Sequence, residues 1–221
     1  MRPPLDPRLN AILDPARAGG HDLLELARAA AAGGATLVQL RDKKSDTRAM
    51  VEEARAIKAV LAPFNVAFVV NDRVDVALAA TAHGVHVGPD DMTPDDARRL
   101  LGPDAIIGLS IKSVAEAEAA PIGLIDYAGV GGVYVTLSKE QKMPPIGTDG
   151  FARVANALRR RAPTLPIVGI AGIDVGNAGA VIAAGADGVA VISALSGSRD
   201  VAAAARMLRE IVDGTLAKRG T

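Results

Sequence analysis

Three polar side chains, Gln39, Arg41 and Lys43, alternate along the end of the apolar run "TLVQLRDK". Because a β-strand repeats every two residues, all three can point to the same side of a sheet. Arginine and lysine together suit a diphosphate, whose anionic oxygens accept hydrogen bonds from guanidinium and ammonium groups. A solvated strand end would give the same pattern, so this segment alone leaves both interpretations open.

Two other apolar runs end on carboxylates, and this arrangement suggests a metal site. The run "VAFVV" is followed by Asn71 and Asp72, and "GVHVGP" is followed by Asp90 and Asp91. Such residues also form turns and helix caps. Two carboxylates without histidine or cysteine suit Mg²⁺, which keeps several waters and takes phosphate oxygens as ligands. We therefore expect Mg²⁺ as the cofactor.

Hydroxyl groups and a glycine turn follow the remaining apolar runs. They are Ser110 after "IIGL", Thr136, Ser138 and Lys139 after "GGVYV", Gly172 in "IVGIAG", and Ile192 and Ser193 after "GVAV". The loops after the late strands of a β/α barrel commonly bind phosphate through backbone N–H groups, although packing alone would also explain these residues. A cationic cluster, two carboxylates and a separate phosphate site predict a transferase, from which a diphosphate leaves as a second phosphate ester arrives.

The segments that carry these residues are of two alternating kinds. Runs rich in valine, isoleucine and leucine are continuous, which is typical of parallel strands covered on both faces. Segments rich in alanine, leucine and charge, such as "DTRAMVEEARAIKAVLA", suit amphipathic helices. With "LNAILD" as the first strand, the count reaches about eight β/α units, the number that a closed parallel barrel requires.

We therefore predict an α/β protein with a single domain over residues 1–221, a (β/α)8 TIM barrel whose core covers about residues 9–213. No linker rich in serine, proline or glycine interrupts the series. Thr93 and Pro94, followed by two aspartates, predict the start of a helix. An open doubly wound sheet is the alternative, since periodicity cannot show closure, but the GxGxxG motif expected after its first strand is missing.

Composition narrows the classes of partner. Lysine plus arginine and aspartate plus glutamate both total 25, and aromatic residues make up 2%. These values give no reason to expect nucleic acid or an acidic membrane surface, so small molecules are the expected partners, and a homo-oligomer is left open. The chain has no cysteine, no signal-like N-terminus and no apolar run that would span a bilayer, so we expect a cytoplasmic protein. Within "GVHV", His86 is expected to be packed and hydrogen-bonded rather than a ligand.

Several of these pieces, in this order, resemble the thiamine phosphate synthase family. The matching segments are "VQLRDK", "VVNDRVDVALA", "GVHVGPDD", "IIGLS", "YAGVGGVYVTLSK", "GIAGI" and "AAGADGVAVIS", which together extend from about residue 37 to residue 193. The resemblance implies a single β/α barrel. It also implies that 4-amino-2-methyl-5-hydroxymethylpyrimidine diphosphate is joined to a thiazole phosphate, which gives thiamine phosphate and pyrophosphate.

The resemblance also implies a role for each matching residue. The pyrimidine diphosphate would be held by Gln39, Arg41, Lys43, Asn71, Ser110 and Lys139, of which Arg41, Lys43, Ser110 and Lys139 would be catalytic. Asp72 and Asp91 would hold Mg²⁺, and the choice of Asp91 over Asp90 rests on the resemblance alone. The thiazole phosphate would contact Thr136, Ser138 and the Leu137 backbone, above a cup made by Gly172, Ile192 and Ser193.

This reaction fits the chemistry of the chain. The aminopyrimidine ring can stabilise positive charge at its exocyclic methylene carbon, so the C–O bond can break before the thiazole nitrogen attacks. That nitrogen has a lone pair and no proton to lose, so no general base is needed. Some positions depart from the family pattern: Gly132 and Val135 lie in a loop where the family usually has proline, and Leu137 stands where proline or threonine is common. Ala171 takes the first position of a usual Gly-Gly pair.

Two other functions are compatible with the same barrel. A related thiazole tautomerase would be an isomerase, which does not need the diphosphate and metal residues. A non-catalytic barrel that senses a thiamine precursor would use the phosphate cup but would leave Asp72 and Asp91 without a role. Stabilisation by pyrophosphate that depends on Mg²⁺ separates the synthase from both.

Overall fold

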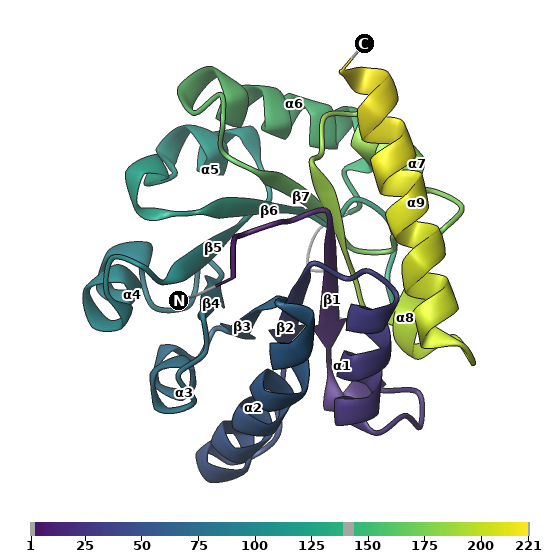
Figure 1. The fold of residues 1–221 in the computed structure, drawn as a ribbon. Helices are drawn as coiled ribbons and strands as arrows, with labels where there is room; N and C mark the ends of the chain where they lie inside the picture. Colours follow the sequence, from purple (N-terminus) through teal and green to yellow (C-terminus); the bar gives the residue numbers. More distant parts are fainter. Residues whose placement is uncertain (1–2, 139–143, 221) are drawn as a thin grey trace.

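The computed structural model describes residues 3–138 and 144–220, and its strands form a closed parallel barrel in chain order (Figure 1). The strands are β1 (Leu9–Leu13), β2 (Leu37–Leu40), β3 (Ala67–Asn71), β4 (Gly84–Val87), β5 (Ile106–Ile111), β6 (Tyr127–Gly131), β7 (Ile167–Ile170) and β8 (Gly188–Val191). β8 returns to pair with β1, with Val189 opposite Leu9. The predicted TIM barrel is confirmed, and the alternative of an open sheet is wrong because the first and last strands are joined.

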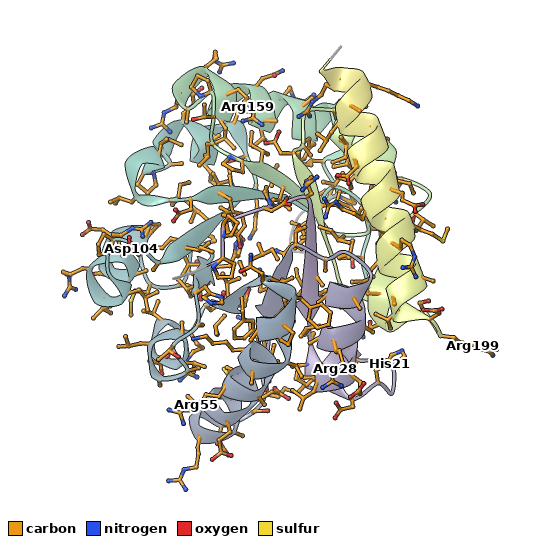
Figure 2. All side chains as sticks on the ribbon, viewed as in Figure 1. His21, Arg28, Arg55, Asp104, Arg159 and Arg199 are labelled. Carbon is orange, nitrogen blue, oxygen red and sulfur yellow. The ribbon has the colours of Figure 1, made fainter. Side chains whose placement is uncertain are left out.

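Helices alternate with the strands and cover the outside of the barrel (Figure 1). They are α1 (Leu23–Ala32), α2 (Thr47–Leu61), α3 (Val74–Ala79), α4 (Pro94–Leu101), α5 (Val114–Ala119), α6 (Gly147–Arg161), α7 (Ala178–Ala183), α8 (Ser193–Ser196) and α9 (Val201–Arg219). Figure 2 shows charged side chains such as Arg28 and Arg55 on the outer surface of this shell. In residues 3–138 and 144–220, no helix is both long and apolar enough to cross a membrane.

Side-chain caps fix the point at which several helices begin. Thr93 accepts a hydrogen bond from the backbone N–H of Asp96 at 3.2 Å, and Pro94 is the first residue of α4, so the predicted helix start is confirmed. Asp22 and Asp46 cap α1 and α2 in the same way. Each such cap is worth about 1 kcal/mol. The caps therefore fix the C-terminal end of the loops that lead from a strand to these helices.

The inside of the barrel is filled by side chains. Leu37, Val69, Ile106 and Tyr127 belong to a buried apolar cluster within it. Leu5, in the segment that precedes β1, packs against this cluster where the strands begin. Because that end is filled, a ligand reaches the barrel from the opposite end, where the strands finish.

A repeated pair of hydrogen bonds joins the strands two by two at the end where they begin. The residue just before each even-numbered strand donates its backbone N–H to a carbonyl of the preceding strand, and its side chain accepts the N–H of the same residue. The four residues are Thr36, His83, Asp126 and Asp187, and their side chains accept from Leu9, Phe68, Ile107 and Ile167 at 3.0, 2.9, 2.8 and 2.8 Å. We call this pair of bonds a strand clamp. Threonine, histidine and aspartate all fill this position, so the strand clamps are not visible as a repeat in the sequence.

Arginines from the helices hold two of the strand clamps. Arg98 donates to Asp126 at 2.7 Å, and Arg159 donates to Asp187, which also pairs with Arg219 at 2.9 Å. Arg98 and Arg159 also donate to backbone carbonyls of the loops that lead into β5 and β7. These charges are partly buried and multiply bonded, so they contribute more than an isolated surface ion pair.

The sixth strand is shorter than the run "YAGVGGVYV" predicted, because β6 ends at Gly131. The chain then forms a loop, in which the N–H groups of Val133 and Tyr134 still donate to the carbonyls of Ile170 and Ala171 at 2.9 and 3.0 Å. The apolar sequence extends beyond β6 because the following loop contacts the end of β7, and not because the strand itself is longer. The loop therefore lies over the end of β7.

Candidate active site

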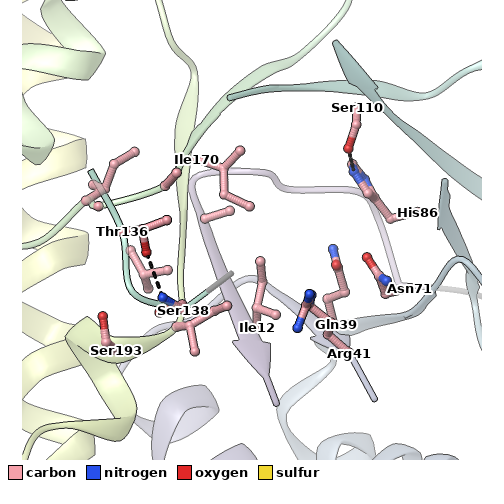
Figure 3. Close-up of a pocket in the computed structure, with 16 residues that line it drawn as sticks. Ile12, Gln39, Arg41, Asn71, His86, Ser110, Thr136, Ser138, Ile170 and Ser193 are labelled. Atoms are coloured by element: carbon pink, nitrogen blue, oxygen red, sulfur yellow. Dashed lines mark hydrogen bonds between the residues drawn. The ribbon is translucent and has the colours of Figure 1, made fainter. Parts of the chain in front are cut away.

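A pocket opens at the end of the barrel where the strands finish (Figure 3). It contains about 570 Å³ of space, including the part open to solvent. The predicted site residues that line it are Gln39, Arg41, Asn71, Ser110, Thr136, Ser138, Gly172, Ile192 and Ser193. Apolar side chains, among them Ile12, Ile170 and Ala190, complete its wall. The structure thus brings together predicted side chains as far apart in the chain as Gln39 and Ser193, as it must for strand ends in one barrel.

Arg41 is held by Asp14, a carboxylate that is not among the predicted site residues. The Nη1 of Arg41 donates to Oδ2 of Asp14, which follows β1 directly and is 4% exposed. The other oxygen of Asp14 accepts the backbone N–H of Ala16 at 2.9 Å. A signal was present, because Asp14 ends "LNAILD" as the other site residues end their strands. Its partner, however, is set by the register that places Leu13 opposite Leu40.

Asp72 and Asp91 lie side by side at the rim of the barrel. Burial raises the pKa of the Asp72 carboxyl, and the adjacent Asp91 raises it further, whereas the hydrogen bond from Lys43 lowers it. Asp91 is fixed by the backbone N–H of Gly88, which donates to its Oδ2 at 2.8 Å, while Asp90 is exposed. Two carboxylates this close repel each other unless a proton or a cation is shared between them.

This pair fits a magnesium ion. Among residues 3–138 and 144–220, no group of three or more histidine, cysteine, aspartate or glutamate side chains could hold a metal. Mg²⁺ does not need such a cage, because it usually takes one or two carboxylates and completes its shell with waters and substrate phosphates. Asp72 also has a left-handed backbone, with φ of 63°, a conformation that aspartate adopts more readily than most residues with a β-carbon.

The other predicted residues lie around the pocket mouth. Lys43 lines an adjoining hollow together with Asp14, Arg17, Arg41, Lys44 and Ser138. The backbone N–H of Ser138 donates to Oγ1 of Thr136 at 3.1 Å, which fixes this part of the loop. Leu137 between them is 86% exposed, so its side chain is not part of the pocket wall. Lys139 lies outside the described residues.

Gly172 allows two loops to meet at the pocket. Its φ is 66°, and a β-carbon on it would lie 2.3 Å from the backbone oxygen of Val135. The loop after β7 therefore passes directly against the loop after β6. Ala171, which takes the first place of the usual glycine pair, also has a left-handed backbone with φ of 85°.

Replacing Gly172 with alanine should lower the free energy of unfolding more than the same change at Gly147. Gly147 has φ of 62° and no atom within 4 Å of the added carbon, so Gly147→Ala isolates the conformational cost of about 1–2 kcal/mol. Gly172→Ala adds an overlap with backbone worth about another 1–3 kcal/mol. Urea unfolding of both variants measures the difference. Equal losses would mean that the two loops are not in contact at Gly172.

His86 is buried and hydrogen-bonded, as predicted, but it also lines the pocket. Its Nε2 lies 2.9 Å from Oγ of Ser110, and its Nδ1 lies 2.9 Å from the hydroxyl of Tyr127 (Figure 3 shows the first contact). Tyr127 is not among the predicted site residues. Its position at the start of β6, opposite Gly108, becomes visible only in the sheet register.

The family model described as thiamine monophosphate synthase matches residues 9–195 of this chain. Among curated relatives, the thiamine-phosphate synthase of Agrobacterium fabrum is 49% identical over 215 residues, which cover 97% of this chain and 98% of the relative. The thiamine-phosphate synthase of Moorella thermoacetica is 50% identical over 194 residues, which cover 88% of this chain and 90% of the relative.

Solved structures give a matching result. Thiamine phosphate pyrophosphorylase from Pyrococcus furiosus has a TM-score of 0.84 to this chain at 37% identity, with 96% of this chain and 98% of that chain covered. A 3-hexulose-6-phosphate synthase has a TM-score of 0.63 at 19% identity, a likeness that concerns the barrel fold alone.

Proposed function

This chain belongs to the thiamine monophosphate synthase family and is a transferase, and we propose that it moves the hydroxymethylpyrimidine group from its diphosphate to a thiazole phosphate. The products are thiamine phosphate and pyrophosphate. The observation that carries this proposal is the meeting of Arg41 and Lys43 with the Asp72–Asp91 pair at one end of the barrel. A leaving diphosphate needs such a combination of cations and metal-binding carboxylates.

The leaving diphosphate would be held mainly by charge. A cation about 4 Å from an anionic oxygen contributes on the order of 4 kcal/mol at an effective dielectric near 20. Among the described residues Arg41 is well placed for this role, because Asp14 fixes its guanidinium and less of it must be ordered when a ligand binds. The pyrimidine ring would lie against Ile12 and Ala190, with Gln39 and Asn71 as polar partners. Developing positive charge on the ring is delocalised, so the chain needs to position the ring rather than remove a proton.

Mg²⁺ would be held by Asp72 and Asp91. Bound there, the ion would neutralise the charge that builds on the diphosphate as the C–O bond breaks. What supports this assignment is the closeness of two carboxylates, one of them with a raised pKa because of its burial. Lys43, which donates to Asp72, would keep the pair oriented and would itself reach a diphosphate oxygen.

The second substrate would bind opposite the cationic side. Gly172 and Ser193 line the same pocket as Thr136 and Ser138, from the loops after β7, β8 and β6. Such backbone turns present N–H groups to a phosphate. The thiazole phosphate would be anchored there, which leaves its ring nitrogen facing the pyrimidine carbon. Catalysis is then positioning of the two rings plus neutralisation of the leaving group.

The isomerase and the sensor are less well supported than the synthase. Neither needs a carboxylate pair beside Lys43 and Arg41. A barrel that only bound a phosphate ester would be complete with the loops after β6, β7 and β8. Such a protein would not need Arg41 and Lys43 on the other side of the pocket. Their presence therefore favours a reaction that releases a diphosphate.

The purified protein should form thiamine phosphate when it is given both substrates and Mg²⁺, and removal of Mg²⁺ with EDTA should abolish product formation. Chromatography of thiamine phosphate and an assay for pyrophosphate follow the two products separately. Pyrophosphate should raise the melting temperature only when Mg²⁺ is present. A rearranged thiazole without use of the pyrimidine substrate would instead support the isomerase, and stabilisation without turnover would support the sensor.

A further inference from the structure

A buried chain of polar side chains runs beneath the pocket, inside the barrel. The imidazole of His86 lies between the Tyr127 hydroxyl and Oγ of Ser110, 2.9 Å from each. Tyr127 is 1% exposed and His86 is 8% exposed, whereas Ser110 is only partly buried and lines the pocket. The chain thus leads from the barrel interior to a hydroxyl that a ligand can touch.

The backbone makes room for these two rings. A β-carbon on Gly108 would lie 2.2 Å from the Tyr127 ring and 2.4 Å from Nδ1 of His86. A β-carbon on Gly129 would lie 2.9 Å from Cε1 of His86. Since ordinary β-carbons do not approach this closely, glycines at both positions are a condition for the contact. The ring arrangement is therefore set by the strands themselves.

The direction of the hydrogen bonds follows from the acceptor available. The Tyr127 hydroxyl is buried, and its oxygen lies 2.9 Å from Nδ1 of His86. A buried hydroxyl proton that is left without an acceptor costs about 1–3 kcal/mol. The phenol therefore donates its single hydroxyl proton to Nδ1 of His86.

The tautomer of the imidazole is then fixed. In a neutral histidine, one ring nitrogen accepts and the other carries the hydrogen. If Nδ1 accepts from Tyr127, Nε2 carries the hydrogen and donates to Oγ of Ser110. The hydroxyl proton of Ser110 must consequently point away from His86. Ser110 becomes a hydrogen-bond donor toward whatever occupies the pocket.

We propose that Tyr127 and His86 are positioning residues that orient the Ser110 hydroxyl as a donor to the leaving diphosphate. This inference rests on the proposed function for the identity of the ligand. The direction of the chain itself, from Tyr127 through His86 to Ser110, rests on the two hydrogen bonds of the imidazole. Tyr127 and His86 would act without touching the substrate.

A hydroxyl-deleting variant and a matched control test the effect on turnover. Tyr127→Phe should lower kcat about tenfold, less than the roughly 100- to 1,000-fold loss for removal of a donor because the Ser110 hydroxyl remains, while KM for the thiazole phosphate stays unchanged. In a Ser110→Ala background the same change should cause no further loss, because its effect passes through Ser110. Thr36→Val also removes one hydrogen-bonded hydroxyl, but from a strand clamp at the other end of the barrel. It should lower stability and leave kcat unchanged.

The tautomer itself can be read by ¹⁵N NMR of the histidine rings in the unmodified protein. The chain has three histidines, and His83 provides an internal reference because its Nδ1 accepts the backbone N–H of Phe68. We expect His86 to show the same Nε2–H pattern as His83, and Tyr127→Phe to change His86 only. An Nδ1–H pattern for His86, or additive losses in the double variant, would overturn the proposal. Failure to form thiamine phosphate would instead refute the proposed function and leave the NMR test intact.

Discussion

Replacing Asp91 with asparagine is expected to lower thiamine phosphate formation on the order of a thousandfold, or roughly 4 kcal/mol of transition-state stabilisation. The substitution keeps the shape of the side chain and an oxygen that can accept from Gly88 N–H, so the fold should be retained. It removes one of two negative charges at the metal position. It also lets the new amide donate to Asp72, which competes with a cation for that carboxylate. Initial rates over a range of Mg²⁺ concentrations measure the loss.

Asp90 supplies the matched control for this experiment. It is the same residue type, adjacent in sequence and exposed, so Asp90→Asn removes an equal charge from the same loop. We expect its rate to stay within about a factor of two of the unmodified protein, as for a surface change away from the site. Excess Mg²⁺ should restore part of the activity of Asp91→Asn and should not affect Asp90→Asn. A large loss in Asp90→Asn instead would mean that the metal pair is assigned to the wrong aspartate.

Arg41→Met should reduce kcat roughly a hundredfold, because it removes a fixed cation from the leaving diphosphate. It should also destabilise the fold. Asp14 is 4% exposed, and without Arg41 its carboxylate is left buried and unpaired, which costs about 3–5 kcal/mol in comparable pairs. The variant therefore has two separable defects, one in rate and one in stability.

A double-mutant cycle with Asp14→Asn separates these defects. Asp14→Asn alone leaves the Arg41 charge in place but loosens it, and we expect about a tenfold loss of kcat. Combined with Arg41→Met, it should add no further loss of rate, and it should recover stability because the unpaired carboxylate is gone. Steady-state kinetics and urea unfolding follow the two quantities. Additive losses of rate would show that Asp14 acts independently of Arg41.

The sequence predicts the barrel well because each strand is a continuous apolar run. Closure is different, since it depends on β8 meeting β1, and no local pattern encodes that contact. The count of β/α units was the only guide. The sequence overestimates the length of β6 for a related reason: Val133 and Tyr134 lie in a loop whose backbone is hydrogen-bonded to the end of β7, and an apolar run looks the same in a strand and in such a loop.

Much of the site could be predicted because strand ends share one rim. Strand ends predict Gln39, Asn71 and Ser110, and all three line the pocket. The sequence does not predict Asp14 and Tyr127, because each matters through a partner that only the register of the strands supplies: Arg41 for Asp14, and His86 for Tyr127. A carboxylate after a strand and a tyrosine inside one carry no such information by themselves.

The strand clamps have a consequence for how this barrel can be rearranged. Each strand clamp joins an odd-numbered strand to the even-numbered strand that follows it. The smallest piece that contains a whole strand clamp is therefore one βαβ segment. A chain break between two such pieces would leave every strand clamp intact. A break within a piece would separate the two strands that one clamp joins. Swapping whole pieces between barrels, or starting the chain at a new point between them, is therefore the natural route for redesign. The site residues lie at the opposite end of the barrel, so each piece would take its own site residues with it.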